Sequence, residues 1–272
     1  MIEIPNISQT NTMGSNNSQI GVQYNHEEHH HHGLSVADAT SMAFAMFREY
    51  YPQLRQEALA SLDEMVTEKL KRIPADCIVP PNARITVPTI QKASITEEPE
   101  IREMYANLLA NSMNAIVKNG VHPSFVEIIN QISPDEAKIL KHFFGNNTIP
   151  TLTLRAENEK HEGVDVIRNF SDIGEKCGCE EKYSLNKYFD NLIRLGLVGS
   201  AESLSSLTDK TKYEPLKVHP VMEAYKKGVE GRPAPYNIAN FNESFLYLSD
   251  FGKSFCGICL GNIKVIRIMQ QE

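Results

Sequence analysis

The stretch TEEPEIREMYANLLANSMNAIVKNGVHPSFVEIINQISPDEAKILKHFF, residues 96–144, has the densest apolar periodicity in this chain. From Ile101 to Ile116, apolar residues recur at three- and four-residue steps, which predicts one wide buried face of a helix. Thr96 can cap the start of this helix, and Gly120 is expected to end it. No catalytic motif occurs in the stretch, so we interpret it as structural core.

Two shorter helices are predicted in the second half of the same stretch. One follows Pro123, with its isoleucines on one side. The other begins at the sequence SPDE, where Ser133 can cap the helix and Pro134 loses no hydrogen bond in the first helical position. Glu136 is correctly spaced to complete a capping box.

This region resembles a known family. The segments IPADCIVPP (73–81), IREMYANLLANSMN (101–114) and VHPSFVEIINQISPDEAKIL (121–140) are similar to the Abi-alpha (abortive infection alpha) family of bacterial proteins, and the resemblance covers about residues 73–259. It implies a role in defence against phage. The family has no agreed catalytic residues, so the resemblance transfers none to this chain.

Composition narrows the class of protein further. The chain has 27 Lys and Arg against 34 Asp and Glu, which makes nucleic acid an unlikely main partner. The longest apolar run, residues 105–117, is interrupted by Asn107, Asn111 and Asn114, so no transmembrane segment is expected. We predict a cytoplasmic protein that has reduced cysteines and requires no cofactor.

Residues 1–34 differ from the rest and are predicted to form a flexible polar arm with a histidine-rich hinge. From Pro5 to Asn25 there is no charged residue, and Ile20, Val22 and Tyr24 alternate with polar residues as in a strand. The short motif resembles amyloid signalling motifs related to the RIP homotypic interaction motif. This resemblance implies cross-strand stacking with a second copy or with a defence partner that carries a similar motif. The predicted assembly residues are Gln19, Ile20, Gly21, Val22, Gln23, Tyr24 and Asn25. The alternative is a disordered polar tail.

Residues 35–145 are predicted to form a helical body. A first helix begins after Ser35, and Pro52 separates it from a second. The segment IPADCIVPPNARITVPTIQ (73–91) contains four prolines and is predicted to be a connector that cannot form one continuous helix.

Residues 146–272 are predicted to form a smaller α+β module and a tail. TLTLR (151–155) alternates like a strand, and VIRNFSDIGEK (166–176) is helix-like. The polar sequence between the next predicted strand and Asn242 has no clear periodicity and is predicted to be irregular. A helix after Ser184 leads into a strand, and residues 245–259 read as a strand followed by a helix. This order resembles a winged-helix domain.

The charge of the presumed recognition helix argues against a DNA-binding role for this module. Between residues 183 and 197, Lys187 and Arg194 oppose Asp190, a net charge of plus one. A module that binds duplex DNA usually neutralises several phosphates with clustered cations. A winged helix that contacts protein is therefore favoured over one that contacts DNA.

Four cysteines in two close pairs are the candidates for a metal site. Cys177 and Cys179, together with Cys256 and Cys259, have the residue types of a structural zinc site. The second pair also falls in an apolar stripe, where a buried free cysteine is ordinary. We favour buried apolar cysteines without metal and keep zinc as the alternative.

The predicted fold class is mainly α with a smaller α+β part, in which a helical body precedes a winged-helix-like C-terminal module. The leading function is phage defence through self-assembly or assembly with a partner, without enzymatic activity. The alternatives are a winged-helix DNA-binding regulator and an effector enzyme of unrecognised type. No motif with mechanistic spacing supports the enzyme.

Overall fold

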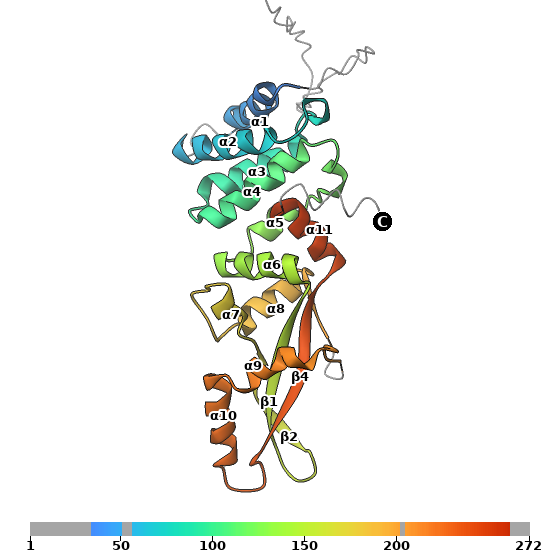
Figure 1. Ribbon diagram of the computed structural model, residues 1–272. Coiled ribbons are helices and arrows are strands. Elements are labelled where there is room, and N and C mark those ends of the chain that lie inside the picture. Colours follow the sequence, from blue (N-terminus) through green and yellow to red (C-terminus); the bar gives the residue numbers. More distant parts are fainter. Residues whose placement is uncertain (1–33, 51–55, 202–204, 262–272) are drawn as a thin grey trace, which may run out of the picture. The chain divides into compact units, whose positions relative to one another are not determined.

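The computed structural model describes residues 34–50, 56–201 and 205–261, and all of these lie in one compact unit. Regular structure is helical as far as Asn146, and the first strand begins at Thr148. Figure 1 shows the succession of helices, the long strands that follow them, and a final helix that returns to the helical part. The described chain is therefore mostly helical with one antiparallel sheet, as the sequence predicted. The predicted flexible arm and the residues Gln19–Asn25 lie outside the described residues.

Four helices form the first part of the unit: α1 (Val36–Tyr50), α2 (Gln56–Leu70), α3 (Ala83–Ile95) and α4 (Pro99–Ser112). Each packs against at least two of the others. The most apolar positions are completely buried, which is the expected result of the helical periodicity. They include Ala43, Leu62, Val66, Ile90 and Leu108.

The proline-rich segment 73–91 is not one continuous helix, as predicted, but its second half is helical and not a connector. After a short 3₁₀ turn, η1 (Ala75–Cys77), residues 83–95 form helix α3, which contains Pro88 in its interior. Asn82 caps this helix through a 3.0 Å bond from the Arg84 amide. An interior proline costs about 3 kcal/mol, and the burial of apolar residues against α1, α2 and α4 offsets that cost.

The limits of α4 also differ from the expectation. Thr96 stands at the C-terminal end of α3, and α4 begins at Pro99. The helix ends at Ser112 because the following backbone pairs with the η1 segment: the amide of Val79 donates to Met113, and the amide of Ala115 donates to Cys77. A short 3₁₀ turn, η2 (Lys118–Gly120), follows.

The two helices after this turn have the predicted form. They are α5 (Phe125–Ile129) and α6 (Pro134–Asn146). The capping box of α6 is confirmed: Ser133 accepts from the Glu136 amide, and the Glu136 carboxylate accepts from the Ser133 amide.

The sheet has four strands in the order β2-β1-β4-β3, and every neighbouring pair is antiparallel. The strands are β1 (Thr148–Glu157), β2 (Gly163–Phe170), β3 (Val198–Ser200) and β4 (Ile238–Leu248). The strand predicted at 151–155 is confirmed within β1. The sheet begins directly after α6, so the helical part fixes where the first strand starts.

Two further expectations for this half were incorrect. Residues 166–170 continue strand β2, because Ile167 pairs with Leu154 and Phe170 pairs with Leu152 of β1. Only α7 (Ile173–Lys176) is helical in that segment, and α8 (Asn186–Arg194) follows. The stretch predicted as irregular contains η3 (Lys210–Tyr213), α9 (Glu214–Lys217), α10 (Pro220–Glu230) and the start of β4.

The described residues have two apolar cores. The larger extends from α1 to α11 and includes Ile149 and Leu246 of the sheet, so it crosses the predicted boundary near residue 145. The smaller lies on one face of the sheet, where Leu152, Leu154 and Ala156 pack against η3, α9 and α10. The division of the chain at residue 145 stays a prediction.

The last helix, α11 (Asp250–Cys259), packs on α4 and α6. The side-chain amide of Asn107 donates to the Cys259 carbonyl, and that of Asn111 donates to the Ile258 carbonyl, each at 2.8 Å. Both asparagines lie on α4, one helical turn apart. They therefore satisfy two of the carbonyls that a helix leaves unpaired at its C-terminal end.

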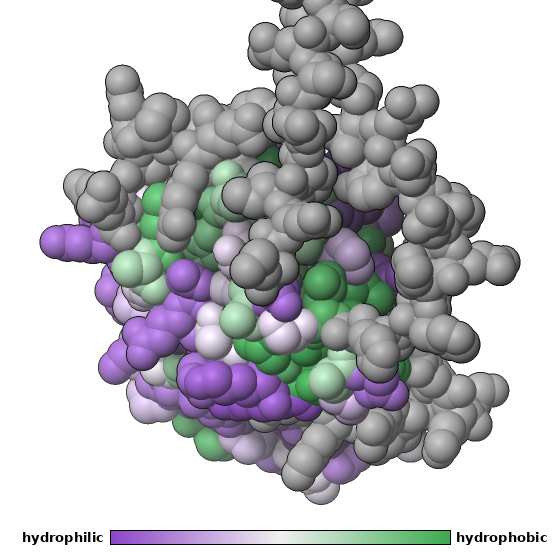
Figure 2. Space-filling view, turned by 90° about the horizontal axis from the view of Figure 1, so that it is seen from above, coloured by the Kyte–Doolittle hydropathy of each residue, from purple (hydrophilic) through white to green (hydrophobic). Residues whose placement is uncertain are grey.

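Part of the helical surface is apolar. Met42 of α1 is 36% exposed and Ile95 of α3 is 64% exposed. Figure 2, which views the molecule from above, shows hydrophobic residues gathered in patches that hydrophilic residues border. None of the described helices is long and apolar enough to cross a membrane.

We predict that Asn111→Leu destabilises the protein by about 2 kcal/mol, because it leaves the buried carbonyl of Ile258 without a donor. Denaturant unfolding of the purified chain measures the effect. Asn119→Leu, on the exposed η2 turn, is the control and should change stability by less than about 0.5 kcal/mol. Equal stability of the two variants would show that the amide bond does not hold α11.

Candidate functional site

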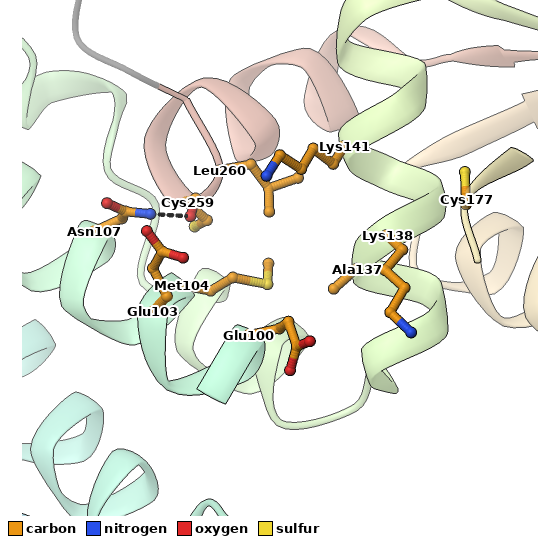
Figure 3. Close-up of a pocket in the computed structure, with 10 residues that line it drawn as sticks. All are labelled: Glu100, Glu103, Met104, Asn107, Ala137, Lys138, Lys141, Cys177, Cys259 and Leu260. Atoms are coloured by element: carbon orange, nitrogen blue, oxygen red, sulfur yellow. Dashed lines mark hydrogen bonds between the residues drawn. The ribbon is translucent and has the colours of Figure 1, made fainter. Parts of the chain in front are cut away.

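A cavity of about 430 Å³ lies among α4, α6, the end of α11 and the segment after α7. Its inner surface is apolar: Met104 and Cys259 are almost completely buried, and Ala137 and Leu260 line it beside them. Figure 3 shows Met104 and Ala137 facing one another across the cavity. Its volume is within the range of about 300–1,000 Å³ that is usual for ligand pockets.

Charged residues of opposite sign line two sides of the cavity. Helix α4 contributes Glu100 and Glu103, and helix α6 contributes Lys138 and Lys141, each pair three residues apart on its helix. Figure 3 shows the two pairs on opposite sides. Glu103 lies 3.4 Å from the ammonium of Lys69. Within the described chain, the side chains of Glu100 and Lys141 form no hydrogen bond or ion pair. The cavity therefore has an apolar floor and a rim with an acidic and a basic side.

Asp135 fixes the lysine side of the cavity. Its side chain is 6% exposed and accepts four hydrogen bonds, from the Glu180 amide, the Glu181 amide, the Tyr188 hydroxyl and the Lys138 ammonium, at 2.9 to 3.3 Å. Lys138 also donates to the carbonyl of Gly178 at 3.2 Å. This cluster ties α6 to α8 and to the segment that carries Cys177.

The hydrogen bonds set the ionisation of this cluster. Burial alone would raise the pKa of the Asp135 carboxyl, but the bonds from Tyr188, Glu180, Lys138 and Glu181 outweigh it and hold that pKa below its usual value. The pKa of Lys138 is raised, chiefly by its bond to Asp135. Burial, followed by the bond to Asp135, raises the pKa of the Tyr188 hydroxyl. At neutral pH the carboxylate and the ammonium are both charged and Tyr188 keeps its proton.

The four candidate zinc ligands are placed as follows. Cys179, Cys256 and Cys259 are buried, which confirms the interpretation of these three as buried residues, whereas Cys177 is half-buried and lines the cavity. Figure 3 shows Cys177 and Cys259 on different sides of the cavity. In the part of the chain that the structure describes, no group of three or more His, Cys, Asp or Glu side chains could hold a metal ion.

The thiols are poor nucleophiles in this environment. Burial raises the pKa of Cys179 to about 11 and that of Cys256 to about 12, and it raises the pKa of Cys259 well above its usual value. Burial also raises the pKa of Cys177. Because the thiolate is the reactive and metal-binding form, these residues are predominantly protonated thiols at neutral pH.

In the presumed recognition helix, α8, both cationic side chains contact other side chains of the same protein. The guanidinium of Arg194 donates to the side chains of Asn191 and Gln131. The ammonium of Lys187 lies 4.9 Å from the centre of the Tyr188 ring. Asp190 is exposed between them. This helix offers little positive charge to a phosphate backbone.

Sequence reasoning missed the residues that organise this region. Asp135 was interpreted only as part of a helix start, and Asn107 and Asn111 only as interruptions of an apolar run. The helical periodicity could have identified the asparagines. Asn107 and Asn111 are four residues apart and lie next to the buried positions Leu108 and Ala110. Polar residues at such positions need a buried partner.

The fold and the site define a helical protein with an antiparallel sheet and a mixed-charge cavity at the docking point of its last helix. A family model described as "Abortive infection alpha" matches residues 54–259, and the chain belongs to this family. No curated protein matches the chain. A solved structure of an uncharacterized protein from the hydrocarbon-degrading marine bacterium Alcanivorax borkumensis SK2 is similar, with 18% identity and a TM-score of 0.35. The match covers 49% of this chain and 90% of that one.

We predict that Asp135→Asn lowers the unfolding free energy at pH 7 by about 2 kcal/mol, because charged hydrogen bonds are lost. The folded-state pKa of Asp135 lies below its unfolded value of about 3.9, so its contribution is fully present above that pH. It is lost as the pH falls through the folded-state pKa. The difference between wild type and variant should therefore shrink below about pH 4.

Chemical denaturation at several pH values measures this dependence. Asp190→Asn on the exposed side of α8 is the matched control and should change stability by less than about 0.5 kcal/mol. A destabilisation by Asp135→Asn that stays constant from pH 7 to pH 3 would contradict the charged role of this carboxylate.

Proposed function

We propose that this protein acts in abortive infection defence against phage, and that it does so in the cytoplasm by assembling through residues Gln19–Asn25. Membership of the abortive infection alpha family is the observation that carries the proposed role. The assembly mechanism rests on the uncharged, alternating sequence SQIGVQYN, whose strands can pair with identical strands from other copies. The partner is a second copy or a defence protein with a similar motif.

The three segments of the chain have different parts in this proposal. Residues 1–34 are the assembly arm, residues 35–145 are the helical body, and residues 146–272 are a protein-contact module. Exposed apolar side chains on the body, such as Ile95, give it surface for contact with other chains. The high pKa values of the thiols and the internal pairing of Lys138 favour binding over catalysis.

We also propose that α6, β1, α8, β3 and β4 correspond to a winged helix. In support, these elements follow one another in the order of a winged helix, and β4 lies between β1 and β3 in the sheet. Strand β2, with η3, α9 and α10, would then be additions to that arrangement. The pairing of Arg194 with Asn191 and Gln131 supports a protein-contact role for α8 over DNA binding.

We predict that Ile20→Asp abolishes assembly and phage protection while the folded unit remains intact. The substitution places a negative charge in every repeat of the stack, where strands pair above and below and identical charges repel. Ile4→Asp, which puts the same charge in the arm outside the motif, is the control and should preserve both properties. Particle mass by light scattering and plaque counts on expressing cells are the measurements.

Thermal unfolding of Ile20→Asp should match that of the wild type and so separate loss of assembly from loss of folding. The proposal is wrong if Ile20→Asp and the wild type have the same particle mass and protect cells equally well. A loss of protection with unchanged particle mass would also contradict assembly as the mechanism.

We predict that the full chain does not bind a 20-base-pair duplex in a salt-dependent manner. A protein that neutralises several phosphates loses roughly 10³-fold or more in affinity between 50 and 200 mM salt, and α8 lacks the free cations for this. Fluorescence anisotropy with labelled duplex at both salt concentrations is the test. Tight binding at low salt that Lys187→Ala weakens would favour the DNA-binding regulator instead.

A further inference from the structure

The chain passes the rim of the cavity beside α11. Leu260 lines the cavity and directly follows α11. The amides of Leu260 and Gly261 both donate to the Cys256 carbonyl, at 2.8 and 2.9 Å, and Asn107 holds the Cys259 carbonyl. The last turn of α11 is thus fixed, and the chain leaves it at the edge of the cavity.

Eleven residues follow Gly261, with the sequence NIKVIRIMQQE, and they lie outside the described residues. Their composition matches the cavity. Five residues are apolar (Ile263, Val265, Ile266, Ile268 and Met269), and two are cationic, Lys264 and Arg267. A chain spans at most about 3.3 to 3.6 Å per residue, so Ile263 to Arg267 are within reach of a cavity that begins at Leu260.

We propose that residues 263–269 of the same chain bind in this cavity. Their apolar side chains would cover Met104 and Ala137. Lys264 and Arg267 would pair on the α4 side with Glu100 and with Glu103, which also pairs with Lys69. On the other side, Lys138 is already paired with Asp135 and so does not repel these cations strongly. Lys141 lines the cavity, has no ion pair among the described residues, and would keep the two cations on the α4 side.

The covalent link favours this occupant over a free peptide. A segment attached to the cavity rim by a few residues has an effective concentration in the millimolar range. A second copy of the chain would have to compete with that concentration.

Cys177 provides a probe within the cavity. It is half-buried and lines the cavity, whereas Cys179, Cys256 and Cys259 are buried. The experiment treats the full chain with N-ethylmaleimide and follows the labelling of each cysteine over time by peptide mass mapping. Deletion of residues 262–272 should speed the labelling of Cys177 at least about fivefold, on the scale of removing a bound cover, and leave the three buried cysteines unchanged.

Charge exchange tests the pairing directly. Glu100→Lys with Glu103→Lys should speed Cys177 labelling as the deletion does, and so should Lys264→Glu with Arg267→Glu. The combination of all four should restore protection, a result that a general loss of folding cannot give. Glu159→Lys with Glu162→Lys is the matched control, because these exposed acids are also three residues apart but lie between β1 and β2.

Three results would overturn the proposal. One is a Cys177 labelling rate that the deletion does not change. Another is failure of the combined charge exchange to restore protection. The third is protection that weakens on dilution of the protein, which would identify the tail of a second copy as the occupant.

Discussion

The docking of α11 on α4 by two asparagine amides is the interaction on which the rest of the structure depends. Asn107 and Asn111 interrupt the apolar periodicity of α4. Their side-chain amides donate to the last carbonyls of α11, the last described helix. Strand β4 leads directly into α11 through the cap residue Ser249. Because Thr148 at the start of β1 pairs with Tyr247 near the end of β4, α6 and α11 hold the same end of the sheet. A neutral hydrogen bond contributes only about 1 kcal/mol, but an unpaired buried carbonyl costs about 1 to 3 kcal/mol, so the pairing fixes where α11 can lie.

Asp135 is a second case in which a buried polar group must be paired, and here the group is charged. A buried carboxylate is costly unless it is paired, and four donors from α6, α8 and the segment between α7 and α8 surround this one. Three of those donors are more than 40 residues away in the chain. The carboxylate thus specifies how α6 and α8 meet, and it also holds Lys138 at the edge of the cavity. Asp135 therefore contributes both to the fold and to the position of a residue that lines the cavity.

Sequence analysis predicted those features that depend on neighbours in the chain. The capping box at Ser133, the strand at 151–155 and the periodic helix around Leu108 all follow from local chemistry. It failed where distant partners decide the outcome. Pro88 lies inside a helix because α3 is enclosed by other helices, and α4 ends early because its next residues pair with residues 77–79.

The candidate site was missed for the same reason. Asn111 and its partner Ile258 are 147 residues apart, and Asp135 and Tyr188 are 53 apart. A single sequence shows that a polar residue interrupts an apolar face, but it does not show which group satisfies it. The cysteines show the opposite case. Their position in an apolar stripe favoured buried thiols over the alternative of zinc, and burial raises the pKa values of Cys179 and Cys256.

The electrostatics of the described surface bear on what kind of partner the protein can use. Lys210 and Lys217 both pair with Glu243, Arg194 binds neutral side chains of its own chain, and Lys138 is held by Asp135. Contacts between exposed groups stabilise a fold by only about 0 to 1 kcal/mol each, but a polyanion would still have to compete with them for these cations. Apolar side chains, in contrast, stay exposed on several elements, including Ile95 and Val218. A protein partner would bury such side chains without breaking any internal pair, which supports the proposed contact with protein.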